Sequence, residues 1–263
     1  MSLELLNKYY EILEKNDWEE FIPKNPRGLY EPTEYIMQLG GKRLRPIAVL
    51  LGCDLFDGAL SKCVGPAWSI ELFHNFTLAH DDIMDQANLR RGKDSMHIKY
   101  GIDQAIISGD AMMILAYQAF ESLSSKTFKR VSKVFSNAAL HICEGQQIDM
   151  QFESMNEVSL DDYVAMIKGK TAALLGASLQ IGALVGGASK KESKGLYGIG
   201  ELVGIAFQIK DDLLDIYGEQ EKVGKRKSGD LLQRKKSIPW IIAFDIAGQP
   251  DRLVMDKWLQ FDE

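Results

Sequence analysis

The sequence predicts an all-α protein, and three observations support this class. Apolar residues recur at helical spacing in long stretches of the 263-residue chain. No run of alternating Val, Ile or Thr lies between paired turn dipeptides, so strand signals are nearly absent. Glycine and proline pairs separate stretches of about helix length. We therefore expect nine or ten helices joined by short loops.

The predicted helices follow from these patterns in chain order. Residues 3–15, 111–123 and 133–150 have apolar residues spaced three or four apart. Pro46 suits the first turn of a helix, where its missing N–H is not needed. Segment 171–189 is rich in glycine and alanine, which favours a closely packed core helix rather than a membrane span. Breaks are expected at residues 25–26, 40–41, 65–66, 186–187 and 218.

Composition limits the function classes. The net charge of −6 argues against general nucleic-acid binding, which requires a basic face. No linker-like segment marks a boundary, so we expect one domain over residues 1–263. The three cysteines have no metal-binding spacing and are expected to be buried free thiols. The sequence shows neither a signal peptide nor a membrane span, which predicts a cytoplasmic protein.

The motif Asp-Asp-x-x-Asp occurs twice, each time inside an apolar helical stretch. The first copy is Asp81, Asp82 and Asp85, and the second is Asp211, Asp212 and Asp215. The first and last aspartates of each copy lie one helical turn apart and share a face. Like charges at this spacing repel unless cations neutralise them. Mg²⁺ binds one or two carboxylates together with substrate phosphates, so the motifs predict a magnesium and diphosphate site.

Basic residues accompany the acidic motifs. GGKRLRP, residues 40–46, places three basic side chains beside a double glycine and a helix start, which is a good phosphate receptor. Arg90 and Arg91 follow the first aspartate motif by one to two turns, and Lys170-Thr171 form a further group. Lys225 and Lys235 follow the second aspartate motif. The sequence thus supplies acids for metal and bases for two phosphate groups.

The chain resembles the trans-isoprenyl diphosphate synthases in an ordered set of motifs: GGKRLRP, HNFTLAHDDIMDQANLRRG, EGQQID, KT and FQIKDDLLD. The local sequence around the first aspartate motif is most similar to that of the short-chain archaeal-type geranylgeranyl diphosphate synthases. The resemblance extends from about residue 40 to residue 239. It implies the isoprenoid synthase fold, in which the helices of a single bundle surround a central active-site cavity. Relatives commonly continue further past Pro239, so this chain is expected to be short at its C-terminus.

The resemblance also implies roles for individual residues. Isopentenyl diphosphate would be bound by Lys42, Arg45, His74 and Arg91. The allylic diphosphate would be bound by Arg90, Lys170, Thr171, Gln208, Lys225 and Lys235, in a cavity also lined by Gln146 and Asp149. Up to three Mg²⁺ ions would be held chiefly by Asp81, Asp85 and Asp211, with Asp82, Asp212 and Asp215 in supporting positions. The catalytic set would be Asp81, Asp85, Asp211, Lys170 and Lys225.

The implied reaction is head-to-tail condensation of isopentenyl diphosphate with an allylic diphosphate of 5 to 15 carbons. Phe76 and Thr77, five and four residues before Asp81, resemble the pair that favours a C20 product, and Phe73 lies deeper. A farnesyl or longer-chain synthase is the alternative. A terpene cyclase would lack the isopentenyl diphosphate site, and a non-catalytic subunit of a heteromeric synthase tends to lose motif aspartates. A homodimer is also implied by the resemblance.

One segment departs from the family pattern. Where the family has GSDLxEGKxT, this chain reads SGDLLQRKKS, so Gln233 and Arg234 replace an acid and a glycine.

Overall fold

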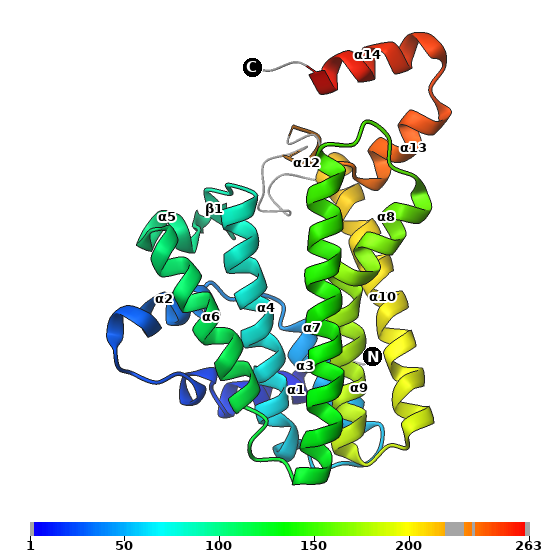
Figure 1. Ribbon diagram of the computed structural model, residues 1–263. Coiled ribbons are helices and arrows are strands. Elements are labelled where there is room, and N and C mark those ends of the chain that lie inside the picture. The colour runs from blue at the N-terminus through cyan, green and yellow to red at the C-terminus, as the bar shows by residue number, and fades with distance from the viewer. Residues whose placement is uncertain (1–2, 219–228, 233–234, 261–263) are drawn as a thin grey trace. The chain divides into compact units, whose positions relative to one another are not determined.

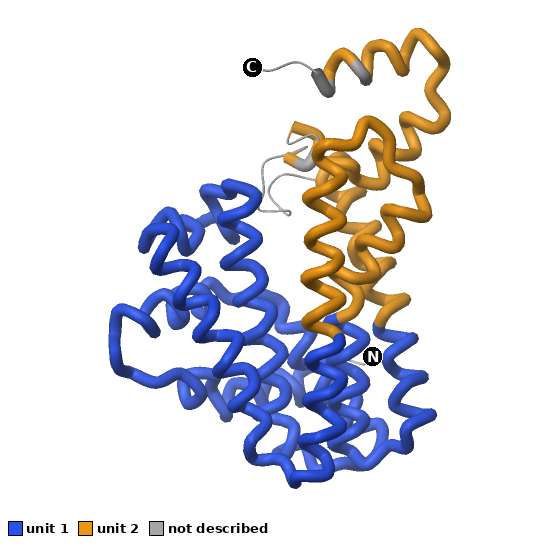
Figure 2. Tube along the Cα trace, in the orientation of Figure 1, with its two compact units in different colours: residues 1–137, 174–200 blue, residues 138–173, 201–263 orange. Residues whose placement is uncertain are grey.

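The chain forms helices almost throughout, which confirms the predicted all-α class (Figure 1). The computed structural model describes residues 3–218, 229–232 and 235–260. Contacts between Cα atoms divide the chain into two compact units, shown in Figure 2. Unit 1 comprises residues 1–137 and 174–200, and unit 2 comprises residues 138–173 and 201–263. No helix among the described residues is long and apolar enough to cross a membrane.

Unit 1 contains the whole first half of the chain and a segment of the second half. Its helices are α1 (Leu3–Lys15), α2 (Arg27–Gln38), α3 (Leu44–Asp54), α4 (Val64–Met84), α5 (Met96–Tyr100), α6 (Ile102–Gln118) and α9 (Ala173–Gly186). Short 3₁₀ turns lie at Trp18–Phe21 and Leu60–Cys63, and strands β1 (Leu89–Arg90) and β2 (Lys93–Asp94) form a small hairpin. The boundary between the units falls within α7 (Ser125–Glu153) and within α10 (Lys190–Tyr217).

Unit 2 contains α8 (Leu160–Ile167), a π-helical turn (Lys168–Ala172), α12 (Gly229–Leu232), α13 (Ile238–Ile246) and α14 (Gln249–Gln260). Its core is a cluster of buried side chains from α7, α8, α13 and the loop before α8. The members are Phe152, Val158, Tyr163, Met166, Ile167, Ile238 and Ile241. This core fixes α8 and α13 beside the part of α10 that carries the second aspartate motif, because Ile205 and Ile209 pack against it.

Glycine allows α3 and α9 to approach closely in unit 1. A Cβ atom on Gly182 would lie 1.9 Å from the carbonyl oxygen of Val49, and one on Gly52 would lie 2.4 Å from that of Leu179. Neither position accepts a side chain without a shift of the backbone. The close packing predicted for segment 171–189 is therefore confirmed.

Three details of the sequence prediction were wrong. The expected break at residues 65–66 lies inside the first turn of α4, because Pro66 needs no donor there. The helix expected over 111–123 ends at Gln118, and its remaining residues form turns. Cys53 and Cys63 are buried free thiols as predicted, but Cys143 is exposed on α7.

Candidate active site

The first aspartate motif lies at the C-terminal end of α4. Asp81 and Asp85 are partly exposed, whereas Asp82 is fully buried. Both oxygens of Asp82 accept hydrogen bonds from Nε of Arg90 at 3.1 Å, and Nη2 of Arg90 contacts Oδ1 of the same carboxylate. Burial alone would lower the pKa of Arg90, but its hydrogen bonds with Asp82 and the charge of that carboxylate raise it. Both oxygens of Asp82 are thus occupied by Arg90, and the more exposed carboxylates of this motif are those of Asp81 and Asp85.

The double arginine lies in a hairpin that the sequence analysis did not predict. Leu89 pairs with Asp94 and Arg90 with Lys93, which leaves Arg91 and Gly92 as a two-residue loop. Both loop residues have positive φ, 56° and 77°, as a type I′ turn requires. The Arg-Gly pair between two short segments was the available signal. The turn separates the two arginines, so that Arg90 pairs with Asp82 while Arg91 is the more exposed of the two.

A positively charged cluster lies beside this hairpin in unit 1. Nη1 of Arg45 lies 3.1 Å from Nε2 of His74. Because an arginine only donates, Nε2 accepts this hydrogen bond and the proton of the neutral ring is on Nδ1. Burial, followed by the charges of Arg45, Arg91, Arg90 and Arg43, holds the pKa of His74 well below its usual value. The histidine is therefore a neutral acceptor among cations.

Arg45 itself retains an unused donor. Its Nε is buried and has no hydrogen-bond partner among the described residues. Burial and the nearby charge of Arg91 lower the pKa of Arg45, while the charge of Glu71 opposes them. Burial likewise lowers the pKa of Arg91. A bound anion would relieve both effects, so Arg45, His74 and Arg91 form a candidate anion site.

The GGKRLRP loop supports this cluster. Gly40, Gly41 and Arg43 all have positive φ, at 78°, 138° and 46°. A Cβ atom on Gly41 would lie 2.9 to 3.2 Å from the guanidinium atoms of Arg91, so glycine leaves room for that side chain. Lys42 is exposed, and its carbonyl oxygen accepts a 2.9 Å hydrogen bond from the hydroxyl of Tyr10.

In unit 2, Lys170 and Thr171 lie in the π-helical turn Lys168–Ala172. Nζ of Lys170 lies 2.6 Å from Oδ2 of Asp149, a residue of α7. Gly145 and Gly169 bring the turn and α7 into backbone contact, since a Cβ on Gly145 would lie 2.2 Å from the amide nitrogen of Lys170. Of the residues expected from the EGQQID and KT motifs, Asp149 and Lys170 are thus brought into contact.

The second aspartate motif is anchored by its middle member, Asp212. Its Oδ2 accepts hydrogen bonds from the hydroxyl of Tyr163 at 2.5 Å and from the amide of Ile238 at 3.1 Å. Its Oδ1 accepts one from Nε2 of Gln208 at 2.9 Å, and Oε1 of Gln208 accepts one from the Thr171 hydroxyl at 3.0 Å. Asp212 therefore connects α8, α10, α13 and the π-helical turn.

The two outer members of this motif differ in exposure. Asp211 is exposed, whereas Asp215 is 7% exposed and accepts a 3.2 Å hydrogen bond from the amide of Gly229. Lys235 and Gln146 are partly exposed. Lys225, a predicted catalytic residue, lies outside the described residues, as do Gln233 and Arg234.

The predicted chain-length residues lie in an aromatic cluster of unit 1. The ring of Phe76 lies 5.4 Å from that of Phe73 and 4.8 Å from His80. Phe73 is 1% exposed and packs edge-on against Phe135 at 5.0 Å. The Thr77 hydroxyl donates to the carbonyl of His74 at 2.8 Å, so its polar atom is satisfied within α4. Phe135 was not singled out from the sequence, because it lies far along the chain on α7.

The acidic residues fit Mg²⁺ ions whose coordination is completed by phosphate oxygens of the substrate. The described residues contain no group of three metal-ligating side chains. Mg²⁺ does not require one, because it keeps waters and takes one or two carboxylates plus phosphate oxygens. The exposure of Asp81, Asp85 and Asp211 suits direct coordination, and the protein contacts of Asp82 and Asp212 suit a supporting role.

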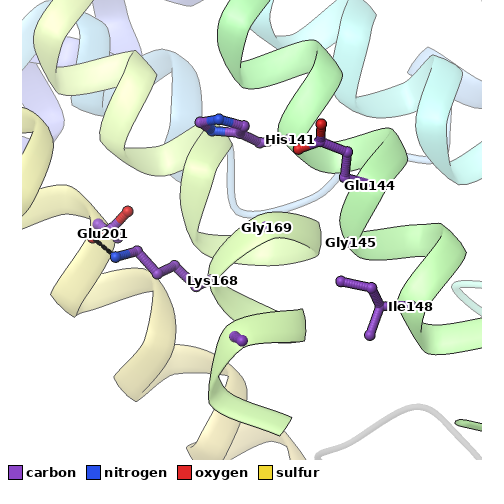
Figure 3. A pocket seen from close by; sticks show the side chains of 8 residues that line it. His141, Glu144, Gly145, Ile148, Lys168, Gly169 and Glu201 are labelled. Carbon is purple, nitrogen blue, oxygen red and sulfur yellow. Dashed lines mark ion pairs between the residues drawn. The ribbon is translucent and has the colours of Figure 1, made fainter. Parts of the chain in front are cut away.

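A separate pocket of about 230 Å³ lies in unit 2 and contains none of the predicted site residues (Figure 3). It is lined by His141, Glu144, Gly145, Ile148, Ala165, Lys168, Gly169 and Glu201. Nζ of Lys168 and Oε2 of Glu201 form a 3.0 Å ion pair there. The pocket shares Gly145 and Gly169 with the backbone contact that positions Lys170, but it is not itself the candidate site.

Comparison with known proteins gives consistent matches over nearly the whole chain. Residues 26–263 match the sequence model of the polyprenyl synthetase family. A geranylgeranyl diphosphate synthase of Sulfolobus acidocaldarius is 36% identical over 260 residues, which are 97% of this chain and 77% of the relative.

Solved structures give the same result. The geranylgeranyl pyrophosphate synthetase of Pyrococcus horikoshii superposes with a TM-score of 0.91 at 36% identity, covering 97% of this chain and 79% of that one. A geranyltransferase of Helicobacter pylori, in complex with magnesium and isoprenyl diphosphate, has a TM-score of 0.78 at 26% identity. The match covers 99% of this chain and 89% of that one.

Proposed function

Since this chain belongs to the polyprenyl synthetase family, we propose that it condenses isopentenyl diphosphate with an allylic diphosphate to make geranylgeranyl diphosphate. The observation that carries this proposal is the anion site around Arg45, whose buried Nε has no hydrogen-bond partner in the part of the chain that the structure describes and lies beside a neutral His74. A terpene cyclase has no use for this second anion site, since it acts on one diphosphate. All six motif aspartates are also present.

The proposed isopentenyl diphosphate site uses donors of unit 1. Arg45, Arg91 and Lys42 would contact the diphosphate oxygens, and His74 would hold the Arg45 guanidinium by accepting its Nη1 hydrogen. A guanidinium pairs with two oxygens at once, which orients the diphosphate as well as binding it. The neutral histidine adds no repulsion to the three cations, so it orients Arg45 without weakening the anion site further.

The proposed allylic diphosphate site uses magnesium together with basic and polar side chains. Magnesium, when bound, would neutralise the charge that develops on the leaving diphosphate. Asp81, Asp85 and Asp211 are the proposed direct ligands, with Asp82, Asp212 and Asp215 supporting them. The proposed direct contacts to the diphosphate are Arg90, Lys170, Thr171, Gln208, Lys225 and Lys235. The complex of the Helicobacter pylori relative with magnesium and isoprenyl diphosphate supports this chemistry.

The reaction then balances without a protein nucleophile. The C–O bond of the allylic diphosphate breaks, and diphosphate leaves with the electron pair. The double bond of isopentenyl diphosphate attacks the allylic cation, which forms the new C–C bond and a tertiary cation. That cation loses a proton to the released diphosphate, and a new double bond forms. Apolar walls such as the aromatic cluster at Phe73 and Phe76 would exclude water from the cations.

The proposal includes a cytoplasmic homodimer. Four isoleucines of α6, Ile102, Ile106, Ile107 and Ile114, are between 42% and 55% exposed, which supports an interface on this helix. Light scattering of the wild type and of an Ile107→Glu variant would test it. We expect a dimer for the wild type and a monomer for the variant.

One assay tests the proposed reaction. The protein is incubated with Mg²⁺, labelled isopentenyl diphosphate and a C5, C10 or C15 primer, and the products are separated by chromatography. Elongation that stops at C20 is the expected result. Cyclised hydrocarbons would indicate a terpene cyclase, products of another length a different synthase, and no turnover a non-catalytic subunit.

A further inference from the structure

The basic loop before α3 contains one arginine that does not join the anion site. Arg43 has a left-handed backbone, with φ 46° and ψ 33°, immediately before the first residue of α3. Its Nη1 lies 2.5 Å from Oε1 of Glu71, and its Nη2 donates to the carbonyl oxygen of Met37 at 2.7 Å. The side chain is 13% exposed, and its guanidinium carbon lies 5.8 Å from the Trp68 ring. Its contacts are therefore internal to the protein.

Glu71, the partner of Arg43, lies on α4 one turn before His74. Its side chain is 3% exposed. Nδ2 of Asn75 donates to the Glu71 carbonyl at 2.8 Å and approaches its Oε1 at 3.4 Å. The carboxylate is thus held by groups on both sides, and it lies at the helix that presents His74.

The charge of Glu71 also acts on the anion site. It opposes the effect of burial on the pKa of Arg45 and on that of Arg91. Arg43, Arg90 and Arg91 surround the same region, and like charges in a poorly solvated site repel strongly. A buried carboxylate therefore lowers the free energy needed to hold these arginines together before an anion binds.

We propose that Arg43 and Glu71 are positioning residues for the isopentenyl diphosphate site, an inference that rests on the proposed function. The pair joins the loop over residues 40–43 to α4. Lys42 and Arg45 flank Arg43 in the chain, and His74 follows Glu71 by one helical turn. Fixing Arg43 to Glu71 fixes these donors relative to one another, and the left-handed backbone at Arg43 is maintained by the same contact.

This role predicts a selective effect on one substrate. If the loop over residues 40–43 leaves its binding geometry, only a fraction of the protein molecules can bind isopentenyl diphosphate. The apparent dissociation constant for this substrate then rises by the inverse of that fraction. A competent fraction of about one tenth would raise the Michaelis constant for isopentenyl diphosphate about tenfold. The allylic site uses other residues, so its Michaelis constant is expected to stay within about twofold.

The test compares three variants with a control. Glu71→Gln keeps the shape of the side chain and removes its charge, and Arg43→Lys keeps the charge and removes the second hydrogen bond. The double variant Arg43→Met/Glu71→Leu replaces the ion pair by apolar groups, a change that is often neutral for stability. Asp54→Asn removes another ion pair of unit 1, between Lys8 Nζ and Asp54 Oδ2 at 2.9 Å, and serves as the control.

The measurements are both Michaelis constants, kcat, the urea unfolding midpoint and calorimetric binding of isopentenyl diphosphate alone. We expect the double variant to unfold like the wild type but to bind isopentenyl diphosphate about tenfold more weakly. The Asp54→Asn control should keep both constants. Unchanged binding in the double variant, or an equal rise of both Michaelis constants, would overturn the inference.

The binding measurement separates this inference from the proposed function. Wild-type protein that binds isopentenyl diphosphate but does not extend a primer would overturn the proposed reaction, and the variants' dissociation constants would still decide the role of Arg43 and Glu71. Wild-type protein that does not bind isopentenyl diphosphate would overturn both.

Discussion

The hydroxyl of Tyr163 donates a 2.5 Å hydrogen bond to Oδ2 of Asp212, and both side chains are almost fully buried. The middle aspartate of the second motif is thereby held by α8 as well as by its own helix. Asp82 has the corresponding relationship with Arg90 in the first motif. In each motif the middle carboxylate is held by protein donors, while Asp81 and Asp85 in the first motif and Asp211 in the second are more exposed.

Tyr163→Phe is expected to destabilise the protein by about 1 to 3 kcal/mol, because a buried carboxylate loses a donor. Urea unfolding at pH 7.5 would measure the change. Tyr117→Phe is the control, since its hydroxyl contacts Ser136 at an exposed site and its loss is expected to cost less than about 0.5 kcal/mol. Equal effects of the two changes would argue against the anchoring role of Tyr163.

Asp81→Ala and Asp211→Ala are each expected to reduce kcat/KM at least about 100-fold, because charge stabilisation by a bound metal contributes several kcal/mol. Steady-state rates over a range of Mg²⁺ concentrations would measure this. Asp103→Ala removes an exposed aspartate from the first turn of α6 and should leave the rate unchanged. Near-wild-type rates for either motif variant would contradict the proposed metal ligands.

Phe76→Ala is expected to give products longer than C20, because it removes the ring that contacts Phe73 and His80 above the buried part of the aromatic cluster. Chromatography of the dephosphorylated products would show the shift. Phe128→Ala, at a partly buried phenylalanine in the first turn of α7, is the matched control and should leave the distribution at C20. An unchanged length for Phe76→Ala would mean that another residue limits the product.

The depressed pKa of His74, caused by burial and by the four arginines, makes stability depend on pH. In the unfolded chain a histidine titrates near pH 6.5, whereas the folded protein keeps His74 neutral to lower pH. As the pH falls through about 6.5, the unfolded state alone gains the proton, and the free energy of unfolding decreases. Above that pH His74 does not change the free energy of unfolding, and below it the free energy of unfolding decreases progressively.

His74→Gln lacks this titration and retains an acceptor for Arg45. The unfolding free energy of the wild type relative to the variant should therefore fall by about 1 kcal/mol between pH 7.5 and pH 5.5. Denaturant titrations at the two pH values would measure it. Parallel profiles for the two proteins would show that His74 takes up its proton as readily in the folded state as in the unfolded state, so that its pKa is not lowered.

Much of the fold could be predicted from the sequence, because helical periodicity is a local property. The first helix was predicted over residues 3–15 and is observed as Leu3–Lys15. The aspartate motifs lie on the helices expected for them. The hairpin around Arg91 was missed because its strands have only two residues each, too few to show an alternating pattern.

The contacts of the site were less accessible to sequence reasoning, because they join residues that are distant in the chain. Glu71 and Arg43 are 28 residues apart, and Tyr163 and Asp212 are 49 apart. A glutamate within an apolar helical stretch was the local signal for the first pair, but no role was predicted for it from the sequence. Nothing near Tyr163 in the sequence indicates its partner, since that contact depends on how α8 packs beside α10.

The glycine contact between α7 and the π-helical turn limits how this site can change. Gly145 and Gly169 place two backbones against each other with no side chain between them. Side-chain packing tolerates small substitutions because rotamers adjust, but a backbone contact has no such freedom. The distance between Lys170 and Asp149 is therefore set by two residues that have no functional group. Even an alanine at Gly145 would have to displace the turn that carries Lys170.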